Sequence, residues 1–586
     1  MQFIHVVLLV FSISAVTNVI AQDVQYAVVA FLPAGAQSMG VSIDGGNPHP
    51  LSASQETPQL YTGTAPSPSQ HYQYTILNDQ GQAIATEANQ RAWVSGATST
   101  GNEFFNRSRT TYEVPSLPQA YHPIYPPTFT NMNQSNEVAT VLLEANATAV
   151  QEILGDPKGD HEYARVDRMT YISNKEIFTF TGAGFRNSGQ SSKEFTRQSF
   201  KVKLNEYKAQ GEENQLLYGR TTIKLRSEPA DPTMMREKLA LDMLGAAGAV
   251  TLSSQWIRLY VNGQPFGLFL MTDEATTHFI ESAIYAGDHD RTNTGPTYKM
   301  NSLNATQQGN LVYQGDDVAL YPEWLYELED EGSHEFPNKS DELVPLVQLM
   351  RQLNDTNTDI QSLVDVPHTM LHLAINMLTG AWDGMWYQAS NYFMHNQEEN
   401  RWIAISYDYD EVMGLSSPEY HYMMTTPWQN FTPPGRPRPL IEPILEDEQA
   451  FNNVLTTLVK RFFKPSTLNP RIDAWREMLK EDMAWNLELP HHTSNATINT
   501  TWTLWNYENN VDHQDGQVLG LKQWIQERSS AICQQLSITD EDDLPPLGPY
   551  QQPEGQPQQG SSSSQLPVPF GFLHVLLAVL LVLLLV

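Results

Sequence analysis

Short segments in which apolar and polar residues alternate dominate the first part of the chain. They lie at residues 25–31, 40–43 and 71–77, and Gly, Pro, Asn and Asp residues separate them, as in Asn78-Asp79-Gln80-Gly81. Several short strands at this spacing, each bounded by turn residues, are typical of a β-sandwich. We therefore predict a small β-sandwich over residues 22–115, which would act as a spacer or a carbohydrate-binding module.

A stretch with many Pro and Tyr residues comes next, and residues 116–136 are predicted to form a linker. The main domain is then predicted over residues 137–540. Strand patterns fill its first part, at residues 139–144, 171–173, 176–181, 199–205 and 221–225.

Helical periodicity begins after these strands. A helix is predicted over residues 232–247, with Asp231-Pro232 as its N-cap and first residue and an apolar stripe of Met235, Leu239 and Met243. A hairpin over 254–271 should turn at Asn262-Gly263. From residue 343 onward helices dominate, interrupted by one strand-turn-strand unit at 391–413. This order predicts an α+β, bilobal kinase-like domain behind the β-sandwich, although many α+β proteins share it.

The two ends of the chain carry targeting patterns. Residues 1–21 contain an apolar run and end in Val19-Ile20-Ala21, which predicts a signal peptide rather than a buried strand or helix. Residues 566–586 are apolar apart from His574 and follow the small residues Gly560, Ser561 and Ser562. This pattern predicts a GPI-attachment signal that is removed, with one of these three residues as the attachment site; a tail-anchored helix is the alternative.

Other features also favour a secreted surface protein. Residues 541–565 are low in apolar residues and rich in Gln, Pro and Ser, which predicts a disordered stalk. Cys533 is the one cysteine, so stability must come from a core instead of disulfides. Asn-x-Ser/Thr sequons predict N-glycosylation at Asn106, Asn133, Asn146, Asn304, Asn338, Asn354, Asn430, Asn495 and Asn499. We expect a chain of the secretory pathway, held at the plasma membrane or spore wall by a GPI lipid.

The net charge of −32 changes the set of expected partners. Binding to nucleic acid depends on neutralising phosphates with Lys and Arg, so nucleic acid is not expected as a partner. A ligand such as ATP would need a local basic pocket or bound divalent cations.

The sharpest candidate chemistry lies around the strand-turn-strand unit. Asp383 precedes it, Asn391 opens it, and Asp408 and Asp410 close it. On a strand, residues two apart face the same side, so the last two carboxylates should share one cation or one hydrogen-bond network. Phosphoryl transfer needs one carboxylate to orient the acceptor hydroxyl, and an Asn and an Asp to hold the metal on the phosphates. The alternative is that these residues only satisfy turns and strand ends.

A basic cluster lies earlier in the chain. In the segment 199–204, alternation should point Phe200, Val202 and Leu204 into the core and leave Lys201 and Lys203 on the other face. A Lys there, paired with Glu237 of the helix, would hold phosphates as the strand lysine and helix glutamate of kinases do, with Lys224 on the next strand. Basic residues on an exposed sheet face are the alternative.

These motifs together resemble the CotH spore-coat family. The resemblance runs from about Phe185 to Arg528 and rests on ordered segments: Phe185-Arg186-Asn187-Ser188-Gly189, Lys224-Leu225-Arg226-Ser227, Arg236-Glu237-Lys238-Leu239-Ala240, Leu259-Tyr260-Val261-Asn262-Gly263 and Tyr407-Asp408-Tyr409-Asp410. It implies an atypical kinase-like fold that uses ATP with Mg²⁺ or Mn²⁺ to phosphorylate Ser or Thr of coat or cell-wall proteins. For fungal, mucoralean-type members it also implies a GPI-anchored adhesin or invasin that binds host receptor proteins.

The resemblance also implies residue roles. Asp383 corresponds to the acceptor-side Asp, Asn391 to the metal or phosphate Asn, and Asp408 to the metal Asp, with Asp410 beside it. Tyr407 departs from the family, which often carries Trp there. Two hypotheses therefore stay open: a surface kinase and a non-catalytic adhesin.

Overall fold

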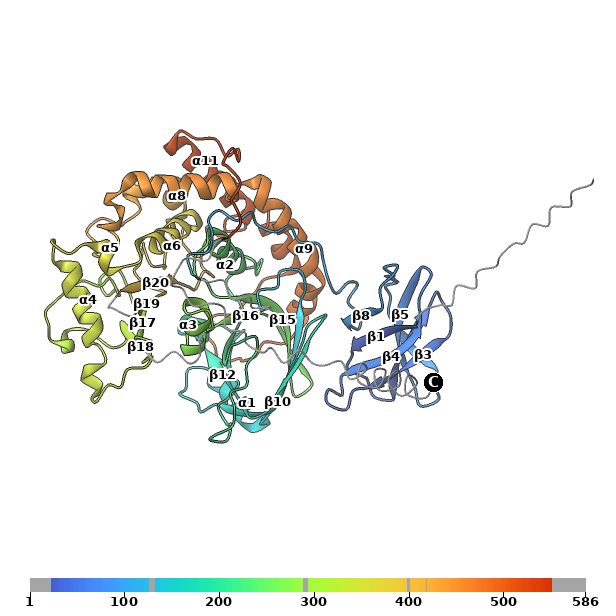
Figure 1. The fold of residues 1–586 in the computed structure, drawn as a ribbon. Helices are drawn as coiled ribbons and strands as arrows, with labels where there is room; N and C mark the ends of the chain where they lie inside the picture. Colours follow the sequence, from blue (N-terminus) through green and yellow to red (C-terminus); the bar gives the residue numbers. More distant parts are fainter. Residues whose placement is uncertain (1–22, 126–131, 288–293, 398–400, 418, 551–586) are drawn as a thin grey trace, which may run out of the picture. The chain divides into compact units, whose positions relative to one another are not determined.

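The computed structural model describes residues 23–125, 132–287, 294–397, 401–417 and 419–550, and it divides into two compact units. The first unit comprises the chain up to Thr111 together with Ile172–Ile177, and the second comprises Tyr112–Tyr171 and the chain from Phe178 onward. Figure 1 draws the strands of the first unit in blue and labels the elements of both.

The first unit is built from strands, as predicted, but they form one sheet. The hydrogen-bonded order is β6-β5-β2-β3-β4-β1-β8, with β7 on β5, and the sheet curls around a core that includes Tyr26 and Tyr74. Because β3 pairs with both β2 and β4, a continuous path replaces the two separate sheets of the predicted sandwich. The strands are β1 (Asp23–Val29), β2 (Ser38–Ile43), β3 (Pro48–Ala53), β4 (Leu60–Pro66), β5 (His71–Leu77), β6 (Ala83–Thr86), β7 (Arg91–Ala92) and β8 (Ser99–Phe104).

The second unit begins with a small β-barrel. Its order is β11-β10-β12-β13-β14-β16-β15-β9, and pairing of β9 with β10 closes the ring around apolar residues such as Phe185, Phe200 and Val202. The strands are β9 (Ala139–Ala145), β10 (Ala164–Ile172), β11 (Ile177–Phe180), β12 (Ala183–Ser188), β13 (Ser199–Lys203), β14 (Thr222–Arg226), β15 (Ser254–Val261) and β16 (Gln264–Asp273).

Two local predictions in the barrel meet different outcomes. The β15–β16 hairpin does turn at Asn262-Gly263, where both residues have positive φ, 51° and 74°, as the tight two-residue turn requires. Helix α2, by contrast, begins at Arg236 and not at Pro232. Met234 has a left-handed φ of 55°, so the helix cannot start before it, and the Asp231 carboxylate accepts hydrogen bonds from the backbone N–H groups of Met235 and Arg236 at 3.0 Å.

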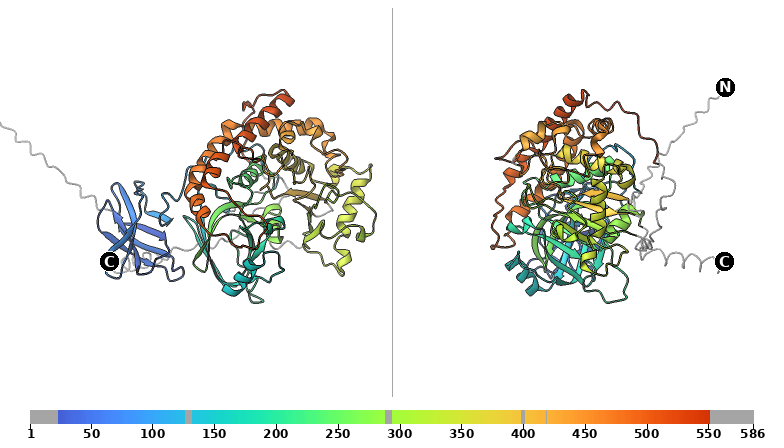
Figure 2. Two further views of the ribbon diagram at one scale, coloured as in Figure 1. Left: turned by 180° about the vertical axis from the view of Figure 1, so that it is seen from behind. Right: turned by 90° about the vertical axis from the view of Figure 1, so that its left-hand side faces the viewer.

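Helices make up most of the rest of the second unit. In Figures 1 and 2, α8, α9 and α11 form an outer arc over α2 and α6. The helices are α1 (Ala147–Gly155), α2 (Arg236–Ala247), α3 (Thr277–Ile284), α4 (Val344–Asn354), α5 (Ile360–Leu363), α6 (Val366–Thr379), α7 (Tyr420–Thr425), α8 (Glu448–Arg461), α9 (Pro465–Glu488), α10 (Leu504–Asn510) and α11 (Leu521–Leu536).

A four-stranded sheet, ordered β18-β17-β19-β20, lies within this helical part. Its strands are β17 (Thr297–Met300), β18 (Tyr326–Asp330), β19 (Tyr392–Asn396) and β20 (Trp402–Ser406). The predicted strand-turn-strand unit corresponds to β19 and β20, but the second strand ends at Ser406. The residues from Tyr407 to Met413 therefore belong to an irregular turn.

The described residues of the predicted linker are packed onto the second unit. Ala120 is 2% exposed and Met132 is fully buried. The backbone N–H of Ala120 donates to the carbonyl of Ala246 at 2.7 Å, and the Tyr125 hydroxyl donates to Asp365 at 2.6 Å. This segment is part of the domain because its apolar side chains enter the core.

The targeting predictions fall outside the described residues. These are the signal peptide, residues 1–21, the GPI signal, residues 566–586, the attachment candidates Gly560, Ser561 and Ser562, and the stalk beyond residue 550. Within the described part of the chain, no helix has the length and apolar character needed to cross a membrane.

Candidate functional site

Asp408 and Asp410 lie in the turn after β20, and both contact the guanidinium group of Arg226. Asp410 Oδ2 lies 3.1 Å from Arg226 Nη2, and Asp408 Oδ1 accepts a hydrogen bond from the same nitrogen. The prediction that the two carboxylates share a partner is confirmed, but for another reason. Asp408 has a left-handed φ of 63°, so an irregular turn and not strand alternation brings them together.

Arg226 is the centre of a larger ionic cluster. It is the last residue of β14 and is 7% exposed. Its Nε also contacts Glu228, at 3.1 Å, and Glu237 in the first turn of α2. Burial alone would lower the pKa of Arg226, but the surrounding carboxylates outweigh burial and hold it well above its ordinary value. Arg226 therefore joins the barrel to the turn that carries Asp408 and Asp410.

Asp383 and Asn391 form a second contact of the same region. Asn391 Nδ2 donates to Asp383 Oδ2 at 3.1 Å and to the Asp383 carbonyl at 3.2 Å. Asp383 Oδ1 is buried and has no hydrogen-bond partner among the described residues. Burial, followed by the charges of Glu411 and Asp408, raises the pKa of Asp383 well above its ordinary value.

The carboxylates of this region outnumber the cations beside them. Burial raises the pKa of Asp410 and Glu228, and then Asp408 and Glu237 respectively raise them further. Burial would raise the pKa of Asp408 too, but Arg226 and then Lys224 hold it below its ordinary value. An excess of carboxylate oxygens, with an Asn amide nearby, fits a hard divalent cation such as Mg²⁺ or Mn²⁺.

The donor atoms are not already grouped for such a cation. Across the described ranges, no three His, Cys, Asp or Glu side chains are arranged to hold a metal ion. The reason is visible in the contacts, because Asp408 and Asp410 both point to Arg226.

A row of basic side chains crosses the barrel strands next to this cluster. Arg186 on β12 pairs in register with Lys201 on β13, and Lys201 pairs with Lys224 on β14. Lys201 Nζ contacts Glu274 at 2.8 Å. Like charges directly opposite each other on a sheet are unfavourable unless anions lie between them. Glu274 neutralises one charge of this row, and the remaining positive charge suits a multiply charged anion.

The predicted alternation along β13 is confirmed. Phe200, Val202 and Leu204 are fully buried, whereas Lys201 and Lys203 are half-buried on the other face. Lys203 lies at the far end of the strand, where its Nζ is 4.9 Å from the Tyr163 ring centroid and 3.5 Å from Glu206.

The predicted pairing of a β13 lysine with Glu237 is wrong. Glu237 pairs with Arg226, and Lys201 pairs with Glu274. Glu237 lies in the first turn of α2, which follows β14 in the chain. The last residue of β14, Arg226, therefore contacts Glu237, and the lysines of β13 do not. The sequence contained a signal for this role, since Arg226 is two residues after Lys224 and shares its face of the strand.

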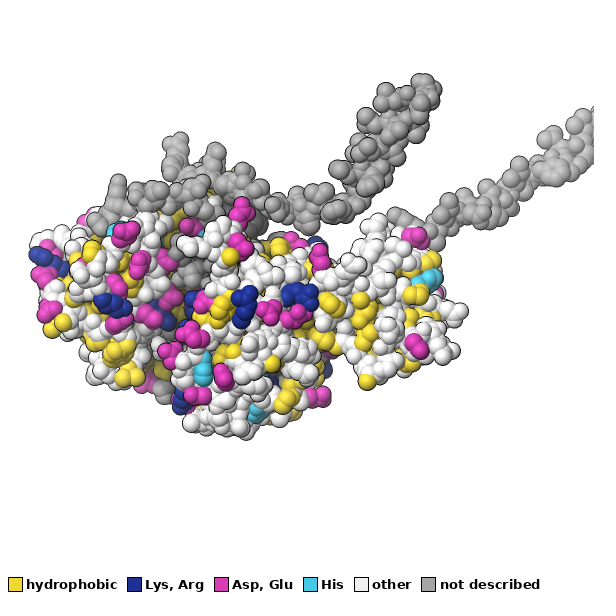
Figure 3. Space-filling view, turned by 90° about the horizontal axis from the view of Figure 1, so that it is seen from below, with side chains coloured by type: hydrophobic (Ala, Val, Ile, Leu, Met, Phe, Trp, Pro, Cys, Tyr) yellow, Lys and Arg dark blue, Asp and Glu magenta, His cyan; other side chains and the backbone are white. Residues whose placement is uncertain are grey.

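All nine asparagines of the predicted glycosylation sequons are exposed. Several of them also form side-chain hydrogen bonds; for example, Asn146 caps α1 by accepting from the Ala149 N–H at 3.0 Å, and Asn133 accepts from Lys238 Nζ at 2.9 Å. Figure 3 shows one face of the molecule, on which Lys and Arg side chains lie among Asp and Glu side chains.

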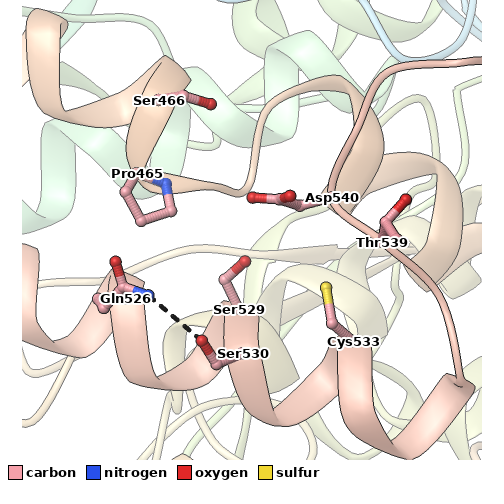
Figure 4. Close-up of a pocket in the computed structure, with 8 residues that line it drawn as sticks. All are labelled: Pro465, Ser466, Gln526, Ser529, Ser530, Cys533, Thr539 and Asp540. Carbon is pink, nitrogen blue, oxygen red and sulfur yellow. Dashed lines mark hydrogen bonds between the residues drawn. The ribbon is translucent and has the colours of Figure 1, made fainter.

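A surface pocket of about 420 Å³ lies between the start of α9 and α11 (Figure 4). Neutral polar side chains, Asp540 and the half-buried Cys533 line it, and none of the candidate site residues does. Burial and then the charge of Asp540 raise the pKa of the Cys533 thiol, which disfavours the reactive thiolate form.

Comparison with known proteins identifies the family. Residues 185–532 match the family model described as CotH kinase protein. The chain belongs to the CotH kinase family. This confirms the resemblance seen in the motifs, and the matched region contains Arg226, Asp383 and Asp408.

Relatives match over most of the chain. Invasin CotH3 of Rhizopus delemar is 24% identical over 578 residues, which cover 94% of this chain and 89% of the relative. Invasin CotH2 of the same fungus is 24% identical, covering 90% of this chain and 86% of the relative. Spore coat protein homolog 1, also from that fungus, is 24% identical, covering 94% and 88%. The names of these relatives imply a surface location.

Proposed function

We propose that the CotH kinase domain binds ATP with Mg²⁺ or Mn²⁺ and transfers the terminal phosphate to Ser or Thr of coat or cell-wall proteins. The observation that carries the proposal is the excess of carboxylates around Arg226, beside a registered row of basic side chains. Phosphoryl transfer needs both features, because acidic side chains hold the divalent cation and basic ones hold the phosphates.

Asp383 is the residue for the acceptor side of the reaction. Asn391 fixes one of its carboxylate oxygens, and the other is buried without a hydrogen-bond partner among the described residues. A carboxylate held in this way orients a Ser or Thr hydroxyl and accepts its proton as the oxygen attacks the phosphorus.

Asp408, Asp410 and Asn391 are the side chains that would hold the divalent cation, because their oxygen atoms match its ligand preference. The cation would neutralise charge on the phosphate oxygens. Lys201, Lys224 and Arg186 would contact the phosphates, since their Cα positions pair directly across three strands.

The test compares Asp408→Ala with the unchanged chain. We expect ATP with Mn²⁺ to stabilise the unchanged chain against thermal unfolding and to give phosphate transfer to itself or to a Ser-rich peptide, and we expect Asp408→Ala to lose both. The control is Asp482→Ala, which also removes a carboxylate paired with an arginine, here Arg258 at 2.6 Å, but outside the site. A ligand response that survives in Asp408→Ala contradicts the proposal.

The names of the relatives favour a second candidate function. Two of them are called invasins, which makes a surface adhesin that binds host receptor proteins the alternative. An adhesin should bind host cells equally well with Asp383→Asn and Asp408→Ala, whereas loss of binding in both variants would tie adhesion to phosphoryl transfer.

The surface location of the relatives supports the proposed GPI anchor. Phosphatidylinositol-specific phospholipase C should release the protein from intact cells. Retention after treatment would favour the tail-anchored alternative.

A further inference from the structure

Helix α6 buries polar side chains along one face. His372 and Asn376 lie one turn apart on α6, and both are fully buried. Buried polar groups of this kind cost free energy unless they form hydrogen bonds, so their partners show what the helix face is for.

These partners are the strand end and the turn that carry the acidic residues. The His372 Nδ1 lies 2.7 Å from the Ser406 hydroxyl and accepts the Ser406 backbone N–H at 3.2 Å. Asn376 Nδ2 donates to the Ser406 hydroxyl at 3.2 Å and to the Tyr409 hydroxyl at 3.0 Å. Ser406 and Tyr409 also hydrogen-bond to each other. Tyr409 stands between Asp408 and Asp410 in the sequence and is 1% exposed.

Asn376 contacts the Asp383 segment as well. Its carbonyl accepts the backbone N–H of Ala381 at 2.9 Å. Its Oδ1 lies so close to Gly384, the residue after Asp383, that a Cβ there would be 2.5 Å from it. One side chain therefore touches both segments that carry the candidate catalytic and metal-binding carboxylates.

The turn around Asp408 needs such support. Asp408 has a left-handed φ of 63°, and the backbone N–H of Tyr409 makes only a long contact, 3.4 Å, with Glu237. A residue in this conformation persists when its surroundings fix it. The buried hydroxyl of Tyr409 is one anchor that α6 provides, and the Thr379 carbonyl, which accepts the Met413 backbone N–H at 2.7 Å, is another.

We propose that Asn376, through Ser406 and Tyr409, is a positioning residue that fixes the Asp408 turn relative to Asp383. This inference rests on the proposed function of the same site. Phosphoryl transfer depends on an in-line arrangement of acceptor, phosphorus and leaving oxygen, so a small displacement between the two carboxylates lowers the rate steeply.

The test is Tyr409→Phe, which removes the anchoring hydroxyl and keeps the buried ring. The matched control is Tyr507→Phe on α10, where a fully buried tyrosine donates to the carbonyl of Arg476 at 2.7 Å, outside the site. Asn376→Ala is the second variant and removes the amide shared by both segments. Both Tyr409→Phe and Asn376→Ala should lower kcat about tenfold or more while KM for ATP changes little, and Tyr507→Phe should change neither.

Amide hydrogen exchange separates this inference from the proposed function. Tyr409→Phe should speed exchange in residues 407–413 and 381–391, and Tyr507→Phe should leave both segments as they are. This result is expected even if the unchanged chain shows no phosphate transfer, in which case the proposed function alone fails. Unchanged exchange in both segments, or a kcat equal to that of the unchanged chain, overturns the positioning role.

Discussion

The ionic cluster around Arg226 gives the most informative perturbation of this protein. Arg226→Gln keeps much of the side-chain volume but removes the positive charge that Asp408, Asp410, Glu228 and Glu237 share. In the unchanged chain this guanidinium satisfies the carboxylates that would otherwise bind a divalent cation. The variant should therefore lose stability and gain cation affinity at the same time.

The magnitude follows from burial. The side chains of Glu228 and Glu237 are 1% exposed, so solvent screens these two charges little after Arg226 is removed. Breaking a buried ion pair by removing one partner costs about 3–5 kcal/mol. Part of this loss returns when Mn²⁺ binds the folded variant, because a ligand present at 100 times its Kd stabilises the native state by about 2.7 kcal/mol.

Two measurements check this prediction without any nucleotide. Urea unfolding at neutral pH gives the free energy of unfolding with and without Mn²⁺, and calorimetric titration gives the Kd for Mn²⁺. We expect Arg226→Gln to bind Mn²⁺ about tenfold or more tightly than the unchanged chain, since Arg226 no longer competes for Asp408 and Asp410.

The control is Arg258→Gln, which removes another buried guanidinium, paired with Asp482. It should lose stability without any gain in Mn²⁺ affinity. Cation affinity of Arg226→Gln no higher than that of the unchanged chain would contradict this prediction, as would equal recovery of stability by Mn²⁺ in Arg258→Gln and Arg226→Gln.

Three further predictions address the site and the core. Lys201→Met should weaken ATP binding about tenfold or more, because Lys201 lies beside Lys224 in the basic row. Lys203→Met, at the end of the strand, should change ATP binding little. Equal effects of the two substitutions in isothermal titration would contradict this assignment. Asp383→Asn should lower kcat for phosphate transfer by about 10²–10⁴ with ATP binding retained, and loss of both would instead make Asp383 a ligand-binding residue. Burial lowers the pKa of His368 from 6.5 to about 4, so the unfolded chain binds a proton at a higher pH than the folded chain does. The free energy of unfolding should therefore fall by roughly 3 kcal/mol as the pH drops from about 6.5 to 4. In His368→Gln the free energy of unfolding should fall less over this pH range, and a pH dependence identical to that of the unchanged chain would count against it.

Features set by neighbouring residues were predictable from the sequence. The Asn262-Gly263 turn was predicted because only a few residue pairs favour two consecutive positive φ values. The alternation along β13 was predicted because strand geometry fixes the side on which Lys201 lies. In both cases the physical cause acts over a few residues, so the sequence contains all the information needed.

Features that depend on packing were not predictable in the same way. Residues 116–136 have the composition of a linker, but Ala120 and Met132 are buried because the second unit offers an apolar surface that no local pattern reveals. The first unit is a single curled sheet because β3 pairs on both of its sides, and strand patterns alone do not report pairing partners.

The residues of the candidate site were only partly predictable from the sequence. Asp383, Asn391 and Asp408 were identified by residue type and spacing, and the structure brings Asp383 and Asn391 into contact. The role of Arg226 depends on closure between residues 182 positions apart, Arg226 and Asp408. No sequence periodicity predicts this contact, because the fold of the whole unit brings the two residues together. The carboxylates of this site could be recognised from residue type and spacing. The arginine that balances their charge could not, because only the folded chain shows which basic side chain the carboxylates contact.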